Sequence, residues 1–482
     1  MRRIVGQLAP PAWYTPTGIA AKSNAVPWGR IVIVLVVLCW GAAPVVGFLN
    51  SLLAVTLVAY AAAFFGFGRP ALSVLGVTLV CTLDPLTRHF LANSVLRWNT
   101  FNYWLIGVAV LSMGFVWRVA DPHSKVVKLL IVILAVGLVL SPDPTRGVQH
   151  LMEICTVFGL LAYFAQAGDD PDAWYMSALV SGTAGALGGL AFFLAKDSLP
   201  FINTNALALF PEAAIFAVCL GFRQAAVHPS GQLMLALLAA VNAMWAFFTG
   251  SRGGLLIVTV GLLFILACTK RTSHRLLGLV GGTLIVLLSF STFDALGNNT
   301  LRRLDKLMND EETSSARTSG RSDLAWAGVH MVNQNPLGVG TGGFAHAWAQ
   351  VGFLPGLSSF KRGEEFQAHS AWIKVLAENG WLGFGVMMVY VGSFAYFGLI
   401  HRRDGSAALG WLATAGLAAA FISTEFQGKA VWMLAAGAAA QLNPQEMARA
   451  MVAEVERYVS RKRRLVSREH MLHPTPLPPT QA

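Results

Sequence analysis

Three side chains in this chain, Arg252, Arg321 and His369, are of the types that bind an anion and move a proton. Arg252 sits in the short turn 249–254 (TGSRGG), between two long apolar runs. A guanidinium this close to hydrocarbon is costly, so it needs a charged partner or an anionic substrate. The small residues around it let backbone or ligand approach closely. Arg252 is therefore a candidate substrate-binding residue, with a snorkelling interfacial arginine as the plainer alternative.

Arg321 stands at the predicted start of a helix. Ser322 or Asp323 is a good N-cap, and the apolar spacing that follows predicts a helix that ends just before Pro336. Free backbone N–H groups at a helix start, together with a cationic side chain, favour an anion such as phosphate. Arg317 would add charge to the same site. The alternative is a solvated basic loop.

His369 opens a second predicted helix, 371–379, with Gly380 as its C-cap. An imidazole beside a helix start meets the positive end of the helix dipole, which favours the neutral form. A neutral histidine can accept a proton, so His369 is a candidate general base. A histidine that only caps the helix or makes a structural hydrogen bond is the alternative.

Polar residues near the apolar run 206–222 form a weaker candidate site. Asn203 and Asn205 precede the run, and Glu212 lies about two turns inside it. A carboxylate at that depth needs a partner or a water-filled cavity. We expect these three residues to line a sugar groove, with a Glu212–Arg252 ion pair as the alternative.

The elements that must position these residues are membrane spans. Of the 482 residues, 55% are hydrophobic and only 12% are charged, whereas soluble domains carry roughly 25% charged residues. We predict an all-α, polytopic helix bundle of about 12–14 spans, since roughly 17–25 apolar residues suit one bilayer crossing. The candidate spans are 31–48, 49–66, 71–86, 102–118, 128–142, 148–166, 173–195, 206–222, 232–249, 253–269, 276–293, 381–400, 406–422 and 428–441.

Lysine and arginine set the predicted orientation. With a cytoplasmic N-terminus, 21 of the 35 basic residues fall in cytoplasmic segments, and the short outer loops are nearly free of them. Both termini are therefore predicted to be cytoplasmic. The same pattern accounts for the formal net charge of +11, so nucleic acid is not a predicted partner. The predicted parts are a cytoplasmic segment 1–30, a helix bundle 31–293, one large and largely helical extracytoplasmic loop 294–380, C-terminal spans 381–441 and a basic cytoplasmic tail 442–482.

Two other kinds of ligand site are rejected. The run 338–343 (GVGTGG) fits the dinucleotide pattern G-x-G-x-x-G, but no strand precedes it. We interpret this run as a flexible turn that brings backbone close to a neighbour. The cysteines lie in apolar runs without metal-binding spacing, and no acidic pair with such spacing falls on the predicted outer side. We therefore predict no metal and no other cofactor.

Three motifs together resemble the O-antigen ligase and polymerase superfamily. They are TGSRGGLL at 249–256, RSDLAWAGVHMVNQNPLGVGTGGF at 321–344 and AHSAWIKVLAENGWLG at 368–383. The run NTNALALF at 203–210 is similar to the family's asparagine-containing segment. Ser370 departs from the family pattern, which often has asparagine after the histidine.

The resemblance implies a metal-independent, inverting glycosyltransferase of the bacterial inner membrane, with an undecaprenyl-diphosphate-linked glycan as donor. It implies that Arg252 and Arg321 hold the diphosphate and that His369 activates the acceptor hydroxyl. A polymerase would use another lipid-linked repeat unit as acceptor, and a ligase would use lipid A–core. We favour the polymerase, because nothing in the sequence identifies a lipid A–core site. The alternative from another functional class is a polysaccharide transporter or flippase that performs no chemistry. The candidate partners are the donor, the acceptor glycan, membrane lipids, and chain-length regulator or flippase proteins.

Overall fold

The structure is a computed structural model of the chain. It describes residues 48–65, 70–90, 100–113, 117, 122–167, 170–195, 204–224, 229–249, 251–269, 321–351, 366–400, 406–423, 428–443, 456 and 460. The predicted segment 1–30, the spans 31–48 and 276–293 and the tail 442–482 lie outside this set, apart from a few single positions.

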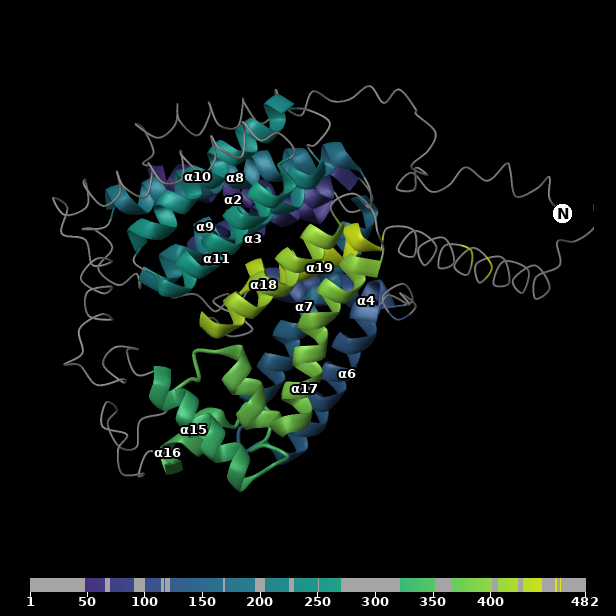
Figure 1. The fold of residues 1–482 in the computed structure, drawn as a ribbon, viewed down its shortest axis with the longest axis vertical. Coiled ribbons are helices and arrows are strands. Elements are labelled where there is room, and N and C mark those ends of the chain that lie inside the picture. Colours follow the sequence, from purple (N-terminus) through teal and green to yellow (C-terminus); the bar gives the residue numbers. More distant parts are fainter. Residues whose placement is uncertain are drawn as a thin grey trace, which may run out of the picture.

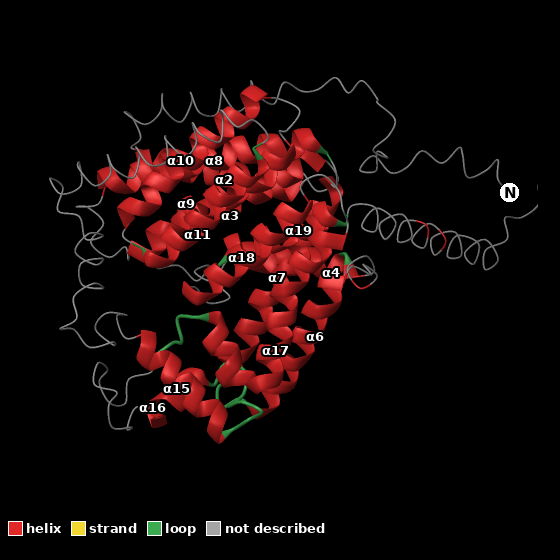
Figure 2. Cartoon of the chain, viewed as in Figure 1, coloured by secondary structure: helices red, strands yellow, loops and turns green. Residues whose placement is uncertain are grey.

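Every secondary-structure element in the described residues is a helix (Figure 2). The elements are α2 (Phe48–Phe65), α3 (Pro70–Phe90), α4 (Thr100–Leu111), α6 (Pro122–Gly137), the 3-10 turn η3 (Leu138–Leu140), α7 (Pro144–Ala167), α8 (Pro171–Ala195), α9 (Thr204–Gln224), α10 (Pro229–Thr249), α11 (Arg252–Cys268), α15 (Arg321–Gln334), α16 (Phe344–Val351), α17 (Ala371–Ile400), α18 (Ser406–Ser423) and α19 (Lys429–Leu442). The predicted all-α fold class is confirmed.

Four stretches within these helices are long and apolar enough to cross a membrane: 123–140, 144–167, 230–249 and 371–400. Parts of α3, α11 and α18 are apolar but shorter. The described helices follow the predicted spans closely. The largest shift at a helix start is in α6, which begins at Pro122 instead of residue 128. Lys128 fits inside that helix because its Nζ donates to the carbonyl of Trp117 at 2.9 Å and lies over the indole ring.

α17 joins two predicted elements, the helix 371–379 and the span 381–400. Gly380 separates them with φ 66° and ψ −167°, a conformation that favours glycine. The predicted helix end at Gly380 is therefore confirmed. In Figure 1, α15 and α16 lie beyond the end of the bundle near the start of α17, and the rest of α17 runs along α6.

Close helix packing in the bundle depends on small residues. A Cβ on Gly185 of α8 would collide with Ala214 of α9, and a Cβ on Gly221 of α9 would collide with Ala178 of α8. Small residues at such contacts let membrane helices approach closely and gain dispersion energy. This packing fixes α9, the helix that carries Glu212.

A buried ion pair joins α3 to α19. Lys429 Nζ donates to Asp84, and the two residues are only 2% and 3% exposed. Lys429 is also the first residue of α19, where the positive end of the helix dipole opposes a cation. The Asp84 carboxylate is therefore the group that makes a lysine tolerable here.

Lys429→Met is expected to lower the free energy of unfolding by about 3–5 kcal/mol, because it removes the positive charge that balances the buried Asp84 carboxylate. The double variant Asp84→Asn/Lys429→Met is expected to recover most of that loss. Thermal unfolding in detergent measures both. A single variant as stable as the wild type, or a double variant no better than the single, would contradict this account.

Candidate active site

His369 has an unusual backbone conformation. Its φ is 52°, the only positive φ at a non-glycine residue in the described part of the chain. The left-handed region is costly for a residue with a Cβ, and such residues cluster at functional sites. His369 is exposed, whereas its neighbours Ala368 and Ala371 are 3% and 0% exposed. The chain is thus anchored on both sides of an outward-facing histidine.

Ser370, the departure from the family pattern, contributes to this anchor. Its Oγ donates to the carbonyl of Phe421 on α18 at 3.0 Å. One turn later, Lys374 N–H bonds back to the carbonyl of Ser370 at 3.0 Å, so α17 begins where predicted. The serine hydroxyl therefore ties the residue after His369 to α18.

Arg321 is the first residue of α15, and the predicted N-cap is wrong. Ser322 and Asp323 lie inside the first turn, with Ser322 Oγ 3.5 Å from Asp323 Oδ1. The reason is that Asp323, 8% exposed, suits the positive end of the helix dipole just as well from within the first turn. Because the Asp323 carboxylate already lies at the start of α15, binding of an anion there would depend mainly on the guanidinium of Arg321. The predicted helix end before Pro336 is confirmed, since α15 stops at Gln334.

A small apolar core brings the helix of Arg321 to His369. It contains Leu324 and Ala327 from α15, Phe344 and Trp348 from α16, and Ala368 next to His369. A Cβ on Gly328 would fall only 2.5 Å from Ile373 Cγ2 on α17. The structure therefore joins the elements of two predicted site residues, Arg321 and His369.

Arg252 and Glu212 lie in a second region of the candidate site, where α9 meets the start of α11. Arg252 is the first residue of α11, and Ser251 caps that helix by accepting the Gly254 N–H at 3.2 Å. Glu212, 3% exposed on α9, has its Oε1 3.2 Å from the point that a Cβ on Gly254 would occupy. The structure thus brings the predicted carboxylate to the predicted arginine turn. The remaining predicted atoms fall outside the described part of the chain: the side chains of Arg252 and Asn205, and the whole of Asn203 and Arg317.

α18 contacts both regions of the candidate site, the one around Arg252 and the one around His369. α11, which starts at Arg252, packs against α18. The end of α18 in turn accepts hydrogen bonds from the start of α17: Ser370 bonds to Phe421, and Trp372 Nε1 donates to Ala418 at 3.1 Å. Figure 1 shows α18 lying between α11 and α17. One helix thus contacts both the element that starts at Arg252 and the element that presents His369.

The run 338–343 belongs to a loop, residues 335–343, that we call the glycine loop. Gly338, Gly340 and Gly342 have φ of 89°, 92° and 87°, which explains the glycine at every second position. The predicted close backbone approach is found, and backbone hydrogen bonds join the loop to its neighbours. The amides of Val339 and Gly340 donate to the carbonyls of Ala377 and Glu378 at 2.9 and 3.0 Å.

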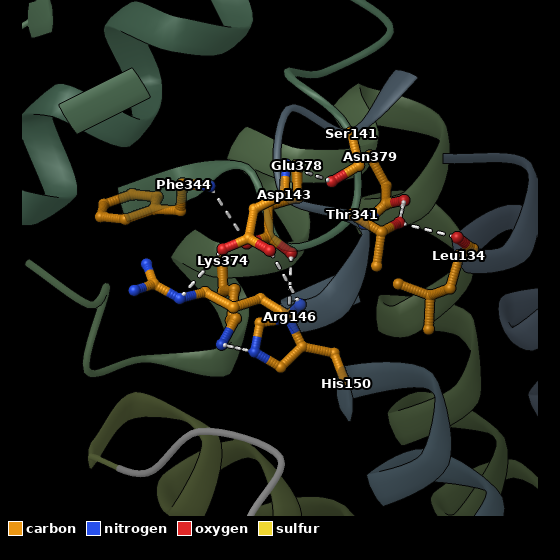
Figure 3. Close-up of polar contacts among 10 residues, drawn as sticks. All are labelled: Leu134, Ser141, Asp143, Arg146, His150, Thr341, Phe344, Lys374, Glu378 and Asn379. Atoms are coloured by element: carbon orange, nitrogen blue, oxygen red, sulfur yellow. Dashed lines mark hydrogen bonds and ion pairs between the residues drawn. The ribbon is translucent and has the colours of Figure 1, made fainter. Parts of the chain in front are cut away.

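The other side of the glycine loop contacts the corner between α6 and α7. Thr341 N–H donates to Gly137 O at 3.1 Å, and Thr341 Oγ1 lies 2.8 Å from Leu134 O and 2.9 Å from Asn379 Oδ1 (Figure 3). The loop is therefore held between α17 and the α6–α7 corner.

A buried set of ionisable groups, which we call the polar cluster, was missed by the sequence analysis. It consists of Lys374 and Glu378 on α17 and His150 on α7 (Figure 3). Lys374 Nζ lies 2.7 Å from His150 Nε2, and His150 Nδ1 lies 3.7 Å from Glu378 Oε2. Glu378 Oε1 accepts the Phe344 N–H at the start of α16 at 3.3 Å. The only signal in the sequence is a Lys–Glu pair four residues apart within a mostly apolar run.

Comparison with known families gives a match that spans several of the elements described above. Residues 234–388 match the family described as "O-Antigen ligase", a range that contains Arg252, Arg321 and His369. A search of curated proteins found no match. The matched range runs from α10 to α17 and so includes the membrane turn, the glycine loop and most of the polar cluster. The protein is a multi-pass membrane protein in which residues 234–388, about a third of the chain, match the O-antigen ligase domain family, whose enzymes carry out ligase- or polymerase-type transfer of lipid-linked glycans in surface polysaccharide biosynthesis.

Proposed function

We propose that this protein is a polymerase that transfers an undecaprenyl-diphosphate-linked glycan to a sugar hydroxyl of a second lipid-linked unit. The observation that carries the proposal is the exposed His369 at φ 52°, held between the small core of α15 and the end of α18. Backbone strain at a solvent-facing histidine is a feature that function, rather than packing, explains.

The arginines are assigned to the donor. As the bond between the anomeric carbon and the phosphate oxygen breaks, the electron pair leaves with the diphosphate, whose negative charge grows. Fixed guanidinium groups stabilise that charge at a site with little water. Arg252 begins a membrane helix, and Arg321 begins the helix that packs beside His369, so the donor would lie between them with its lipid tail in the bilayer. Arg317 is proposed as a third, weaker contact, and Asn203, Asn205 and Glu212 as the lining of the sugar groove.

His369 is assigned to the acceptor. Its imidazole takes the proton of the attacking hydroxyl, the hydroxyl oxygen bonds to the anomeric carbon, and undecaprenyl diphosphate departs from the opposite face. The reaction therefore inverts the configuration of that carbon. The proton then leaves His369 for solvent or for the released diphosphate. No metal enters this scheme.

Contacts between distant parts of the chain support a site on the outer face of the membrane. The predicted topology puts the α6–α7 corner, the end of α18 and the start of α11 on that same face. The described contacts link the glycine loop to the α6–α7 corner, Ser370 to the end of α18, and Glu212 to the start of α11. A transporter is less well supported, because its charged residues would gather near the middle of the membrane.

Gel analysis of surface glycan in a strain that lacks the protein tests the proposal. We expect lipid A–core capped with single repeat units, because repeats are made and attached but not joined. Bare core, with long glycan retained on the carrier lipid, would indicate the ligase instead. Glycan of normal length and attachment would contradict both assignments.

A further inference from the structure

We infer that the polar cluster is a positioning device for the proposed transfer. Lys374, His150 and Glu378 hold the first half of α17 and the glycine loop in the arrangement that presents His369. This inference rests on the proposed function for its activity readout. It concerns residues to which neither the family match nor the motifs assign a role.

The order of donors and acceptors in the cluster is defined by its chemistry. A lysine ammonium has only donors, so His150 Nε2 must accept from Lys374 Nζ at 2.7 Å. The proton of the neutral imidazole then lies on Nδ1, which faces Glu378 Oε2 at 3.7 Å. Nδ1 has no hydrogen-bond partner among the described residues. A cation, a neutral imidazole and a carboxylate therefore lie in sequence with the charges balanced.

Burial makes this order matter. Lys374, Glu378 and His150 are 0%, 1% and 5% exposed. Buried charges without matched partners carry a large penalty, so the three side chains constrain one another's positions. α7, which supplies His150, is packed in the bundle against α3, α4 and α19 and serves as the fixed reference.

The cluster is connected to His369 through the backbone of α17. Lys374 N–H bonds to the carbonyl of Ser370, the residue that follows His369. A shift of Lys374 relative to α7 would therefore also displace His369, which lies about one helical turn before it.

The cluster is connected to the glycine loop through Glu378. Its carboxylate accepts the Phe344 N–H, and its backbone carbonyl accepts the Gly340 N–H at 3.0 Å. Phe344 belongs to the same small core as Ala368, beside His369. The polar cluster thus supports His369 from two sides: through the start of α17, which follows it, and through the small core that contains Ala368 and Phe344.

The test compares His150→Leu with His150→Gln in the purified full-length protein. Leucine removes the acceptor for Lys374, whereas the glutamine amide can still accept through oxygen and donate through nitrogen. We expect His150→Leu to lower the turnover number by about 10²-fold, as a small misplacement of a catalytic group does, with the affinity for undecaprenyl diphosphate unchanged. His150→Gln is expected to recover most of the lost turnover. Thr156→Val, a buried change on α7 outside the cluster, serves as the matched control.

Hydrogen exchange of the peptide that contains the glycine loop and Phe344 gives a second readout that needs no activity. Its amides should exchange faster in His150→Leu, but not in His150→Gln or Thr156→Val. Unchanged exchange, or turnover that falls only in parallel with thermal stability and donor affinity, would overturn the inference. A wild-type protein without transfer activity would instead refute the proposed function, and the exchange comparison would still decide whether the cluster holds the loop.

Discussion

Replacing His369 with alanine is expected to lower the turnover number for glycan transfer by about 10²–10⁴-fold, the range that a general base contributes. The variant should remain in the membrane and still bind the lipid-linked donor, because the arginines assigned to the donor are untouched. The physical reason is that the acceptor hydroxyl would lose the only group assigned to take its proton. Turnover with purified donor and acceptor, measured beside donor binding, separates the two effects.

Two controls sharpen this prediction. His346→Ala changes an exposed histidine on α16 and should leave turnover close to that of the wild type. His369→Gly should be as inactive as His369→Ala but more stable by about 1 kcal/mol or more, since glycine accepts a positive φ without strain. Full product from His369→Ala would remove the catalytic assignment.

Arg252→Ala and Arg321→Ala are each expected to weaken binding of undecaprenyl diphosphate and to lower turnover by about 10²–10³-fold, the loss seen when one group that stabilises a developing anion is removed. The effect on turnover should exceed the effect on ground-state binding, because the charge on the diphosphate is greatest when it leaves. Lysine at either position should restore only part of the loss, since an ammonium lacks the planar fork of a guanidinium.

Arg146→Ala provides the matched comparison for the two arginine variants. Arg146 lies at the α6–α7 corner, half-buried, with its Nε 3.2 Å from Asp143 Oδ2. It removes one positive charge without touching the proposed donor site, so donor affinity should hardly change. Unchanged affinity and turnover in Arg252→Ala or Arg321→Ala would exclude that residue from the donor site.

Most of the fold could be predicted because the residues within a membrane helix and at its ends are enough to identify it in the sequence. Apolar runs of the right length, bounded by proline, glycine or charge, located most of the described membrane helices to within a few residues, but α16 was not predicted and α6 begins six residues earlier than expected. Gly380 was identified as a helix end because a single residue type serves that conformation. The start of α15 was misjudged because Ser322 and Asp323 suit a cap and a first turn equally well.

The residues of the proposed site could be selected from the sequence only where neighbouring residues give a local signal. Arg252, Arg321 and His369 stand beside helix starts, and that setting can be read from neighbouring residues. The polar cluster has no such signal, because Lys374 and His150 are separated by 224 positions and meet only in the folded protein. The glycine loop was recognised as a close approach, but its partners at Gly137 and Glu378 could not be known from spacing.

Photocrosslinking with a donor analogue tests the central claim most directly. The claim is that the start of α11 and the start of α15 hold one diphosphate between them, next to His369. An undecaprenyl-diphosphate glycan with a photoreactive group in its first isoprene unit would be activated in membranes, and the labelled peptides would be identified by mass spectrometry. We predict labelling of both the turn 249–254 and the peptide that begins α15, with the α15 label lost in Arg321→Ala. Labelling of only one of these segments, or of neither, would contradict a site shared between the membrane bundle and the extracytoplasmic loop.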